Sequence, residues 1–534
     1  MKCTVSRIGC AAACMALCLA LGCSCSVLPP ASGKPAAAAS SVPTDKNGNL
    51  LYDSSRLDDG RLRMLYGYDS SGNSCTVLCG GKVLYQSLRS ENVSLLQDTV
   101  TGETDYWFRT WADPDARCGR RSGLFDKSGS EVITFEGEQN ATLQNGLLVL
   151  HENTGINEAA PTSACQVIDL ATGESLPTPE GAYNCVVCGD VLVFNCYARP
   201  AGLAEDEWDD NINLNSWVIV QTRDGTQTLR ADSTYAYRLS YSPDGLDGWV
   251  ELDTYSASGA PTTQTLYNPS TGESFADLQQ VCGSGMVSFR TENGKYELRD
   301  LTVEDRGLIA TFDDQPSSYF PGYVVTWRTS GDFGYNLNDL VTGEVTPLYA
   351  SSVMSDTIAL YYEDGRLKVF STETGDLITD TTVAPVEGQQ SVMMDNKGDG
   401  YVWLELRDND NFETTATRVY GPEGLVSDLT HLQDKYYALN SLTTTPEGRP
   451  LYYGTAEAPS RSGSLCDVLD ENGNIVFYGL GSCYSYYDNS LNQLPEHVFV
   501  AKRGFYYGWM DTDGKWLYCR SIFSSINADD EMGY

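Results

Sequence analysis

One short turn motif recurs along the chain and restricts its fold more than any other feature. It consists of an Asp, Asn or Ser, two further residues, then Thr, Gly and an acidic residue. Four copies are present, at residues 169–174, 268–273, 339–344 and 371–376. In a tight hairpin the first side chain accepts hydrogen bonds from the turn backbone, and the glycine adopts a positive φ. Each copy therefore predicts a hairpin between two strands.

Short apolar runs alternate with these turns, and helical periodicity is nearly absent. The runs are rich in β-branched and aromatic residues and follow a polar or Gly-rich turn; they are residues 147–150, 191–194, 286–289, 323–326 and 357–360. Such runs, bounded by turns, are typical of strands. Gly (50 residues) and Tyr (33 residues) are abundant, which suits the same class. We therefore expect an all-β protein.

The spacing of the turns indicates a repeat. Hairpin glycines of this motif and its relatives lie at positions 129, 173, 225, 272, 343, 375, 424, 473 and 514, mostly 40 to 52 residues apart. A four-stranded unit of this length is the signature of a propeller blade, which must stack because one sheet cannot bury both faces alone. We predict a single β-propeller of seven or eight four-stranded blades over residues 50–525. The alternative is two smaller β domains, divided near residues 330–332 or in the loop 204–215.

Some units resemble known propeller families over about ten residues each. Residues 508–517 (GWMDTDGKWL) look like a WG repeat with the order of Gly and Trp reversed, and residues 123–133 are a weaker match. The Thr-Gly-Glu hairpins resemble those of quinoprotein-type propellers, and residues 241–245 (YSPDG) resemble a TolB-like hairpin. These resemblances imply the propeller architecture and transfer no activity, quinone site or calcium ligand.

The N-terminus predicts export and a lipid anchor. Lys2 and Arg7 precede an uncharged stretch that is too short for a comfortable membrane span and ends in LALGC, with Cys23 last. This resembles the lipobox of bacterial lipoproteins, which implies a signal peptide at 1–22, acylation of Cys23 and a place on the outer face of the cell membrane. The alternative is an ordinary cleaved secretory signal. Residues 23–49, rich in Ala, Ser and Pro, are expected to be a disordered tether, and the polar tail 526–534 is expected to fray.

Charge restricts the partners. The chain has 72 acidic and 35 basic residues, a formal net charge of −37. Such a surface repels nucleic acid, so we expect no nucleic-acid partner. We expect contact with membrane lipid through Cys23 and a protein or glycan ligand of unknown identity.

Catalytic and metal motifs are nearly absent from the sequence. Seventeen Cys and three His are present, and Cys185 and Cys188 form the only close CxxC. We expect buried cysteines in strands, with one or two disulfides as an alternative, rather than zinc or a redox pair. There is no nucleophile elbow, phosphate-binding loop or HExxH motif. A glycosidase needs only two carboxylates, but 72 acidic residues leave the pair undefined.

Aromatic clusters and one acidic loop are the candidate ligand-binding residues. They are Tyr484, Tyr486, Tyr487 and Trp509, together with Trp208 in the loop 204–213. Aromatic rings beside Asp and Asn suit sugars, and loops on a rigid scaffold often carry binding. The alternative is that the tyrosines pack between blades and that the loop is a solvated insertion.

Calcium is the one cofactor that the sequence leaves open. Asp408 and Asp410 belong to a partial calcium loop and are the candidate metal ligands, with an Asx-rich turn as the alternative. The function that fits these observations is a non-catalytic, lipid-anchored cell-surface binding or scaffold protein. The alternative is an extracellular propeller enzyme that acts on glycans or uses a quinone-type cofactor.

Overall fold

The computed structural model describes most of the chain between residues 59 and 521. The described residues are 37–38 and 59–521, except for 70–71, 81, 88–91, 117–118, 153–164, 204–211, 240–245, 247, 329–333, 355, 386–389, 410–412, 457–464, 485–496 and 504–505. Within them, every regular element is a strand apart from one turn of 3₁₀ helix, η2 (Thr430–Leu432). The prediction of an all-β protein is confirmed.

The strands form consecutive antiparallel sheets, which we number 1 to 11 in chain order. Sheets 1 to 5 consist of β2 (Leu62–Asp69), β3 (Gly72–Cys79) and β4 (Lys82–Ser87); β5 (Asn92–Leu96), β6 (Tyr106–Ala112), β7 (Arg120–Asp126) and β8 (Glu131–Glu136); β9 (Gln139–Gln144), β10 (Leu147–Glu152) and β11 (Gln166–Asp169); β12 (Ala182–Cys188), β13 (Val191–Tyr197), β14 (Ser216–Thr222) and β15 (Gln227–Asp232); and β16 (Thr234–Arg238), β17 (Val250–Tyr255), β18 (Pro261–Tyr267) and β19 (Ser274–Ala276).

The second half of the chain continues the pattern. Sheets 6 to 11 consist of β20 (Leu278–Gly283), β21 (Met286–Arg290), β22 (Tyr296–Asp300) and β23 (Leu308–Phe312); β24 (Gln315–Phe320), β25 (Tyr323–Trp327), β26 (Tyr335–Asp339) and the start of β27 (Val345–Met354); the end of β27, β28 (Thr357–Tyr362), β29 (Arg366–Ser371) and β30 (Leu377–Thr382); β31 (Gln390–Gly398), β32 (Tyr401–Asp408), β33 (Thr414–Gly421) and β34 (Gly424–Asp428); β35 (Ala438–Thr444), β36 (Pro450–Thr455), β37 (Cys466–Leu469) and β38 (Ile475–Leu480); and β39 (Ser482–Tyr484), β40 (Val498–Arg503), β41 (Tyr506–Asp511) and β42 (Trp516–Ser521).

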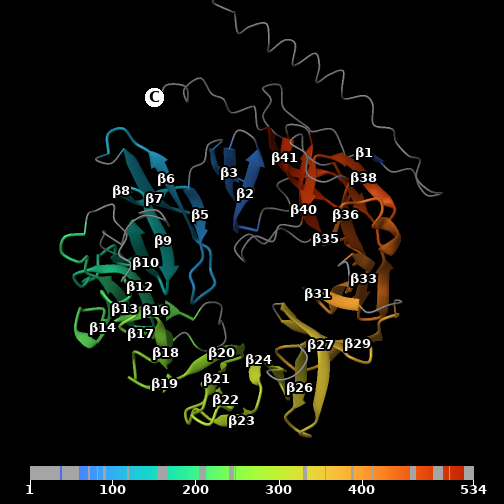
Figure 1. The fold of residues 1–534 in the computed structure, drawn as a ribbon. Coiled ribbons are helices and arrows are strands. Elements are labelled where there is room, and N and C mark those ends of the chain that lie inside the picture. Colours follow the sequence, from blue (N-terminus) through green and yellow to red (C-terminus); the bar gives the residue numbers. More distant parts are fainter. Residues whose placement is uncertain are drawn as a thin grey trace, which may run out of the picture.

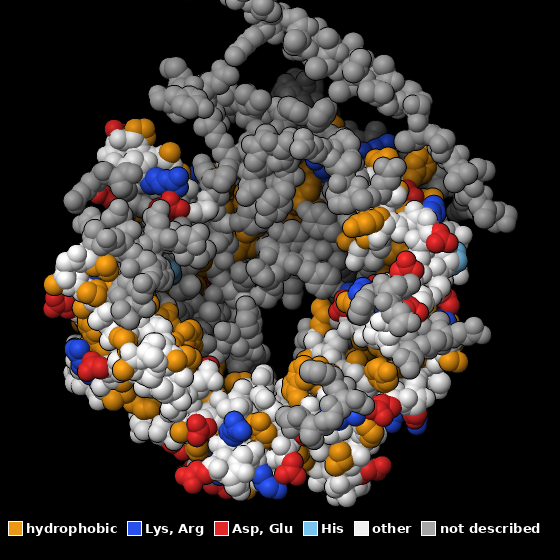
Figure 2. Space-filling model, in the orientation of Figure 1, with side chains coloured by type: hydrophobic (Ala, Val, Ile, Leu, Met, Phe, Trp, Pro, Cys, Tyr) orange, Lys and Arg blue, Asp and Glu red, His pale blue; other side chains and the backbone are white. Residues whose placement is uncertain are grey.

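The sheets stand around a central opening, with the first strand of each sheet towards the middle and the last at the rim (Figure 1). Figure 2 shows the opening on one face of the ring. The first and last sheets close the ring, because Leu65 and Leu78 of sheet 1 pack in one cluster with Trp509 and Tyr518 of sheet 11. The described strands therefore form one propeller rather than two separate β domains.

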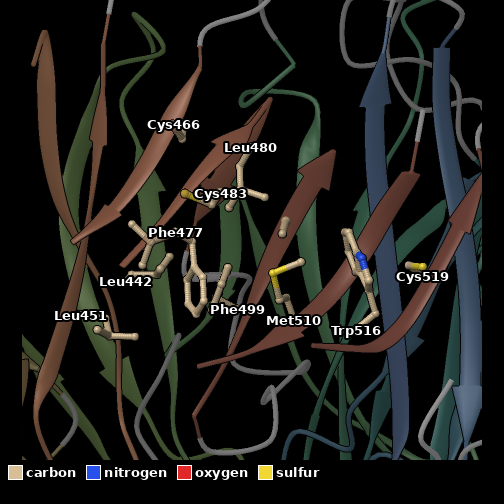
Figure 3. Close-up of a cluster of buried hydrophobic side chains, with 12 residues drawn as sticks. Leu442, Leu451, Cys466, Phe477, Leu480, Cys483, Phe499, Met510, Trp516 and Cys519 are labelled. Atoms are coloured by element: carbon tan, nitrogen blue, oxygen red, sulfur yellow. The ribbon is translucent and has the colours of Figure 1, made fainter. Parts of the chain in front are cut away.

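The core is divided into one apolar cluster for each pair of neighbouring sheets. In the cluster between sheets 10 and 11, Phe477 of β38 faces Phe499 of β40 and Met510 of β41 (Figure 3). Second strands are covered by sheets on both sides, so all seven residues of β13 are buried. This explains why these strands appear in the sequence as continuous apolar runs rather than as alternating ones.

The predicted blade count of seven or eight is wrong. The described residues form ten hydrogen-bonded sheets, and the seven-stranded one contains two four-stranded units, because β27 pairs with β26 at one end and with β28 at the other. The nine hairpin glycines of the sequence mark nine of these eleven units. Sheet 6 was missed because its outer turn, between β22 and β23, lacks the Thr-Gly motif. Sheet 1 was missed because the turn between β3 and β4, which contains Gly80, also lacks it.

The recurrent hairpins have the predicted geometry. In the turn between β26 and β27, Asp339 Oδ1 accepts hydrogen bonds from the backbone N–H groups of Val341 and Thr342, both at 2.8 Å. Gly343 follows with a φ of 75°. These turns join third to fourth strands, so they all lie at the same end of their sheets as the turns that join first to second strands. Loops between second and third strands lie at the opposite end.

Two residues of the predicted disordered tether are ordered against the ring. β1 (Ala37–Ala38) pairs in parallel with β38, at Phe477 and Tyr478. The expectation of a tether without regular structure is therefore wrong at these two positions. The outermost strand of a sheet has unpaired backbone groups that accept an additional strand. Among the described residues no helix has the length and apolarity needed to span a membrane.

Candidate functional site

Most of the ligand-binding residues predicted from the sequence lie outside the described residues. Trp208, Tyr486 and Tyr487 are among those not described, and Tyr484 is described only as a strand residue of β39. Cys23 also lies outside the described residues. These predictions are therefore untested.

Trp509 is a core residue, and its prediction as a ligand-binding residue is wrong. It is 1% exposed, and its ring centroid lies 5.9 Å from that of Tyr518 in the cluster that closes the ring. A ring in this position cannot stack on a ligand from solvent. Tyr452 and Tyr507 are buried as well, at 1% and 5% exposure, so in these strands the alternative of packing between blades is confirmed.

The metal and thiol predictions have different outcomes. Asp408 ends β32, whereas Asp410 is not described, and no group of three His, Cys, Asp or Glu side chains suited to a metal ion occurs among the described residues. Cys185 and Cys188 are both buried, but they belong to the clusters on opposite faces of sheet 4. The prediction of buried cysteines in strands is confirmed for these two, and every cysteine among the described residues is a free thiol.

A polar and aromatic cluster on sheet 5 is the candidate functional site among the described residues. Pairing in register places Tyr235 opposite Asp253, and Tyr237 opposite Glu251, across β16 and β17. On the other side of β17, Asp253 is opposite Gln264 of β18. Alternation along the strands puts these side chains on the same face of the sheet. We call Tyr235, Tyr237, Glu251, Asp253, Tyr255 and Gln264 the carboxylate–tyrosine cluster.

The cluster borders the part of this face that packs against sheet 6. On the same face, Leu266 of β18 lies directly opposite Glu251 and is fully buried against Leu278 and Val287 of sheet 6. The face therefore carries polar and apolar side chains next to each other. Because β16 is the first strand of its sheet, it lies on the side of the central opening (Figure 1). Tyr237 is 42% exposed, so the cluster is open to solvent.

The two carboxyl groups lie beside each other and lack a compensating cation. Glu251 and Asp253 are neighbours on one face of β17, and the Gln264 amide donates to Glu251 Oε1 at 2.9 Å. Asp253 is 9% exposed, and its Oδ1 has no hydrogen-bond partner. Burial raises the pKa of Glu251, and the neighbouring Asp253 raises it further. Burial also raises the pKa of Asp253. The pair therefore retains a proton to higher pH than ordinary carboxyl groups.

Tyrosine rings form the border of the carboxyl pair. The ring centroids of Tyr235 and Tyr237 are 4.4 Å apart, and Tyr183 of β12 lies 6.3 Å from Tyr235. The hydroxyls of Tyr237 and Tyr255 are 3.4 Å apart. Burial raises the pKa of Tyr183, Tyr235 and Tyr237, so these hydroxyls stay neutral at physiological pH. The cluster thus offers ring faces, neutral hydroxyls and two acids.

A second concave region lies between sheets 7 and 8. Its volume is about 280 Å³, and Tyr323, Tyr362, Phe370 and Lys368 are among the residues that line it. Its two basic side chains already have partners within the chain. Lys368 Nζ lies 5.1 Å from the ring centroid of Tyr362, and Arg366 forms a hydrogen-bonded ion pair with Asp380. This cavity is therefore a weaker candidate than the cluster on sheet 5.

The sequence analysis missed the carboxylate–tyrosine cluster. The available signal was the spacing Tyr-x-Tyr at 235–237 and Glu-x-Asp at 251–253, which places each pair on one face of a strand. Apolar residues occupy the alternate positions, as in Ala236 and Leu252. Which strands are neighbours, however, follows only from the sheet order.

Comparison with known proteins assigns no function. Residues 266–530 match a family model described as a domain of unknown function (DUF5046), and the match begins within sheet 5. No curated protein matches the chain.

Solved structures match at low similarity. BamB from Moraxella catarrhalis is 9% identical, with a TM-score of 0.26 over 64% of this chain and 93% of that one. AztD from Citrobacter koseri is 11% identical, with a TM-score of 0.24 over 69% and 94%. The computationally designed Ika8 protein is 13% identical, with a TM-score of 0.25 over 62% and 100%. At these scores the propeller assignment rests on the sheet order and the packing clusters alone.

Proposed function

We propose that the protein is a non-catalytic binding module, exported and lipid-anchored through Cys23 on the outer face of the cell membrane. In this proposal the propeller is a rigid frame, and the carboxylate–tyrosine cluster on the side of the central opening is its ligand site. The tether of residues 23–49 would hold the ring away from the lipid headgroups. The ligand is a group carried by a protein or glycan at the cell surface.

The closeness of the two carboxyl groups is the observation that carries this proposal. Glycoside hydrolysis needs carboxyl groups roughly 5–10 Å apart, because the scissile bond and the attacking water lie between them. Glu251 and Asp253 are instead neighbours two residues apart on one strand face, where burial and the adjacent Asp253 both raise the pKa of Glu251. Such a pair is suited to holding a charge in place rather than to dividing the roles of acid and base. For this reason we favour binding over the alternative of a glycan-cleaving enzyme.

The anchor is tested by substitution in the full-length protein in a bacterial host. Cys23→Ala is expected to release the protein from the membrane fraction, while Cys25→Ala, two residues away, is expected to leave it there. Incorporation of a labelled fatty acid into the parent and the Cys25→Ala protein, but not into Cys23→Ala, would support acylation at Cys23. Labelling of the Cys23→Ala protein would contradict the anchor.

The binding role is tested on intact cells. Photocrosslinkers placed at solvent-exposed positions beside the cluster, such as Thr262, are expected to capture a surface component. A crosslinker at Glu131, on the rim of sheet 2, is the matched control and is expected not to capture it. Turnover of a glycan by the purified full chain, abolished by Asp253→Asn, would contradict the non-catalytic assignment.

A further inference from the structure

We propose that the carboxylate–tyrosine cluster binds an organic ammonium ion, with Glu251 and Asp253 as counter-ions and the rings of Tyr235 and Tyr237 against its methylene groups and charge. This inference rests on the proposed function and specifies the chemistry of its ligand. An alkylammonium group is found on lysine side chains, polyamines and amino sugars, so the same chemistry can be presented by a protein or by a glycan.

The unpartnered oxygen of Asp253 is the first argument. A buried polar atom without a partner is costly, and such atoms in folded proteins call for an explanation. Asp253 Oδ1 lies on the face that carries Tyr235, directly opposite in the ladder. No basic side chain contributes to the pKa of either carboxyl group among the described residues. The cluster therefore offers two acids without a cation from the described chain, and an acceptor that a donor cation would satisfy.

The aromatic surroundings are the second argument. Elsewhere the chain fills similar aromatic sites with its own cations. Arg109 Cζ lies 4.5 Å from the ring centroids of Tyr85 and Trp111, and Arg230 Cζ lies 4.7 Å from that of Trp217. Among the cation–ring contacts within the described residues, none involves Tyr235 or Tyr237. Carboxylates beside aromatic faces are a recurring way to recognise ammonium ions.

The number of ligands argues against a metal ion. Calcium takes six to eight oxygen ligands, usually including several carboxylates. The cluster supplies two acids, and the described residues contain no group of three metal-ligating side chains. A primary ammonium has three N–H donors, which two carboxyl groups and a tyrosine hydroxyl can accept. The acceptors of the cluster fit this smaller demand.

Ammonium binding should be coupled to proton release. In the free protein, burial raises the pKa of both carboxyl groups, so the pair retains a proton to higher pH than ordinary carboxyl groups do. The ammonium replaces that proton as the positive partner, so binding should strengthen as pH rises through the elevated carboxyl pKa values. Below that range both groups are protonated and the counter-charge is lost. The affinity should therefore fall continuously between neutral and acid pH.

The test is calorimetric titration of the detergent-solubilised full chain with putrescine at pH 7.5. Butane-1,4-diol, which has the same carbon chain with neutral ends, is the matched ligand control. We expect putrescine to bind and the diol not to bind. Asp253→Asn should lower the affinity for putrescine at least about tenfold, as expected for loss of a charge-assisted hydrogen bond. Asp313→Asn, which removes the same charge from an exposed carboxylate just after β23, should leave the affinity unchanged.

The other outcomes separate this inference from the proposed function. Binding of calcium or of an uncharged saccharide, with no binding of putrescine, would overturn the ammonium site but leave the protein a binding module. If the parent and the Asp253→Asn protein bind putrescine with equal affinity, the assignment of the ammonium site to this cluster is overturned as well. A heat of binding that is independent of the ionisation enthalpy of the buffer would contradict the proton exchange. Glycan turnover would overturn both proposals.

Discussion

Two faces of the propeller carry an aromatic group around a charge, but the charge has opposite sign and origin. On sheet 2, Arg109 of β6 lies over Tyr85, Trp111 and Phe125, with its Cζ 4.5 to 5.3 Å from the ring centroids. On sheet 5, the carboxyl groups of β17 lie beside the rings of β16. Both charged groups belong to the second strand of a sheet. At the first site the chain itself supplies both the cation and the rings, whereas at the second no described basic side chain contributes to the pKa of either carboxyl group.

This difference in the partner of the charged group shows how the same structural repeat can contribute either to stability or to ligand binding. In sheet 2 the neighbouring sheet supplies Tyr85, so the cation and rings fill an inter-sheet contact. Gly123 leaves the room for this arrangement, because a Cβ there would lie 3.1 Å from Trp111 and 3.2 Å from Phe125. In sheet 5, Tyr237 and Gln264 on the polar part of the face are exposed to solvent. A charged group that completes a contact contributes to folding, and one left uncompensated opposes folding and remains available to a ligand.

Deletion of a ring from the completed site should have the largest effect. Phe125 is 7% exposed, and its ring centroid lies 4.4 Å from that of Trp107. Phe125→Ala should lower the free energy of unfolding by about 3–5 kcal/mol, as large-to-small changes in a core do. Tyr235→Ala on sheet 5 should cost clearly less, because its ring is partly exposed. Denaturant unfolding of both variants gives the comparison, and equal losses would contradict it.

Removal of the cation should also destabilise the completed site. Arg109→Met keeps an unbranched chain but loses the charge over three rings. We expect a loss of about 1–2 kcal/mol, the range for a partly desolvated cation–π contact with its packing. The measurement is the denaturant midpoint with an unchanged m-value. Arg61→Met, at an exposed surface ion pair, is the control and should change stability little.

The propeller could be predicted from the sequence because its turns have local causes. The Asp side chain and the glycine of each hairpin shape the turn within a six-residue motif, so the turn depends only on local sequence. Asp339 and Gly343 have the expected geometry. The number of blades could not be counted in the same way. The turn between β22 and β23 is longer, without Thr-Gly, and β27 serves two sheets at once. A count based on one turn type therefore omits a unit wherever another turn performs the same task.

The site could not be predicted because it depends on long-range coverage. Trp509 and Tyr237 both belong to aromatic runs in strands, yet Trp509 is 1% exposed and Tyr237 is 42% exposed. The difference arises from the neighbouring sheet, which covers one ring and not the other. Sequence periodicity assigns a residue to a face of its strand but does not say how far the next sheet extends over that face.

Neutralisation of the uncompensated site should stabilise the protein. The pKa values of Glu251 and Asp253 are raised in the folded state. The folded protein thus binds more protons than the unfolded chain above the ordinary carboxyl range, so this pair makes stability fall as pH rises through the raised pKa values. Asp253→Asn should therefore be more stable than the parent at pH 7.5, by about 1 kcal/mol, the lower end for an unpartnered buried polar atom. The gain should vanish near pH 4, and a destabilised variant at pH 7.5 would contradict the comparison.

The smallest expected effect separates the ring of Tyr237 from its hydroxyl. The hydroxyl makes one exposed contact, 3.4 Å from that of Tyr255, so Tyr237→Phe should change stability by less than about 0.5 kcal/mol. The ring face remains, and putrescine affinity should be nearly unchanged. Tyr237→Ala removes the face as well and should weaken putrescine about two- to fivefold, the share of an exposed cation–π contact. If Tyr237→Phe loses as much putrescine affinity as Tyr237→Ala, the hydroxyl rather than the ring contacts the ligand. The rings on sheet 5 would then not hold a cation in the way that the rings on sheet 2 hold Arg109.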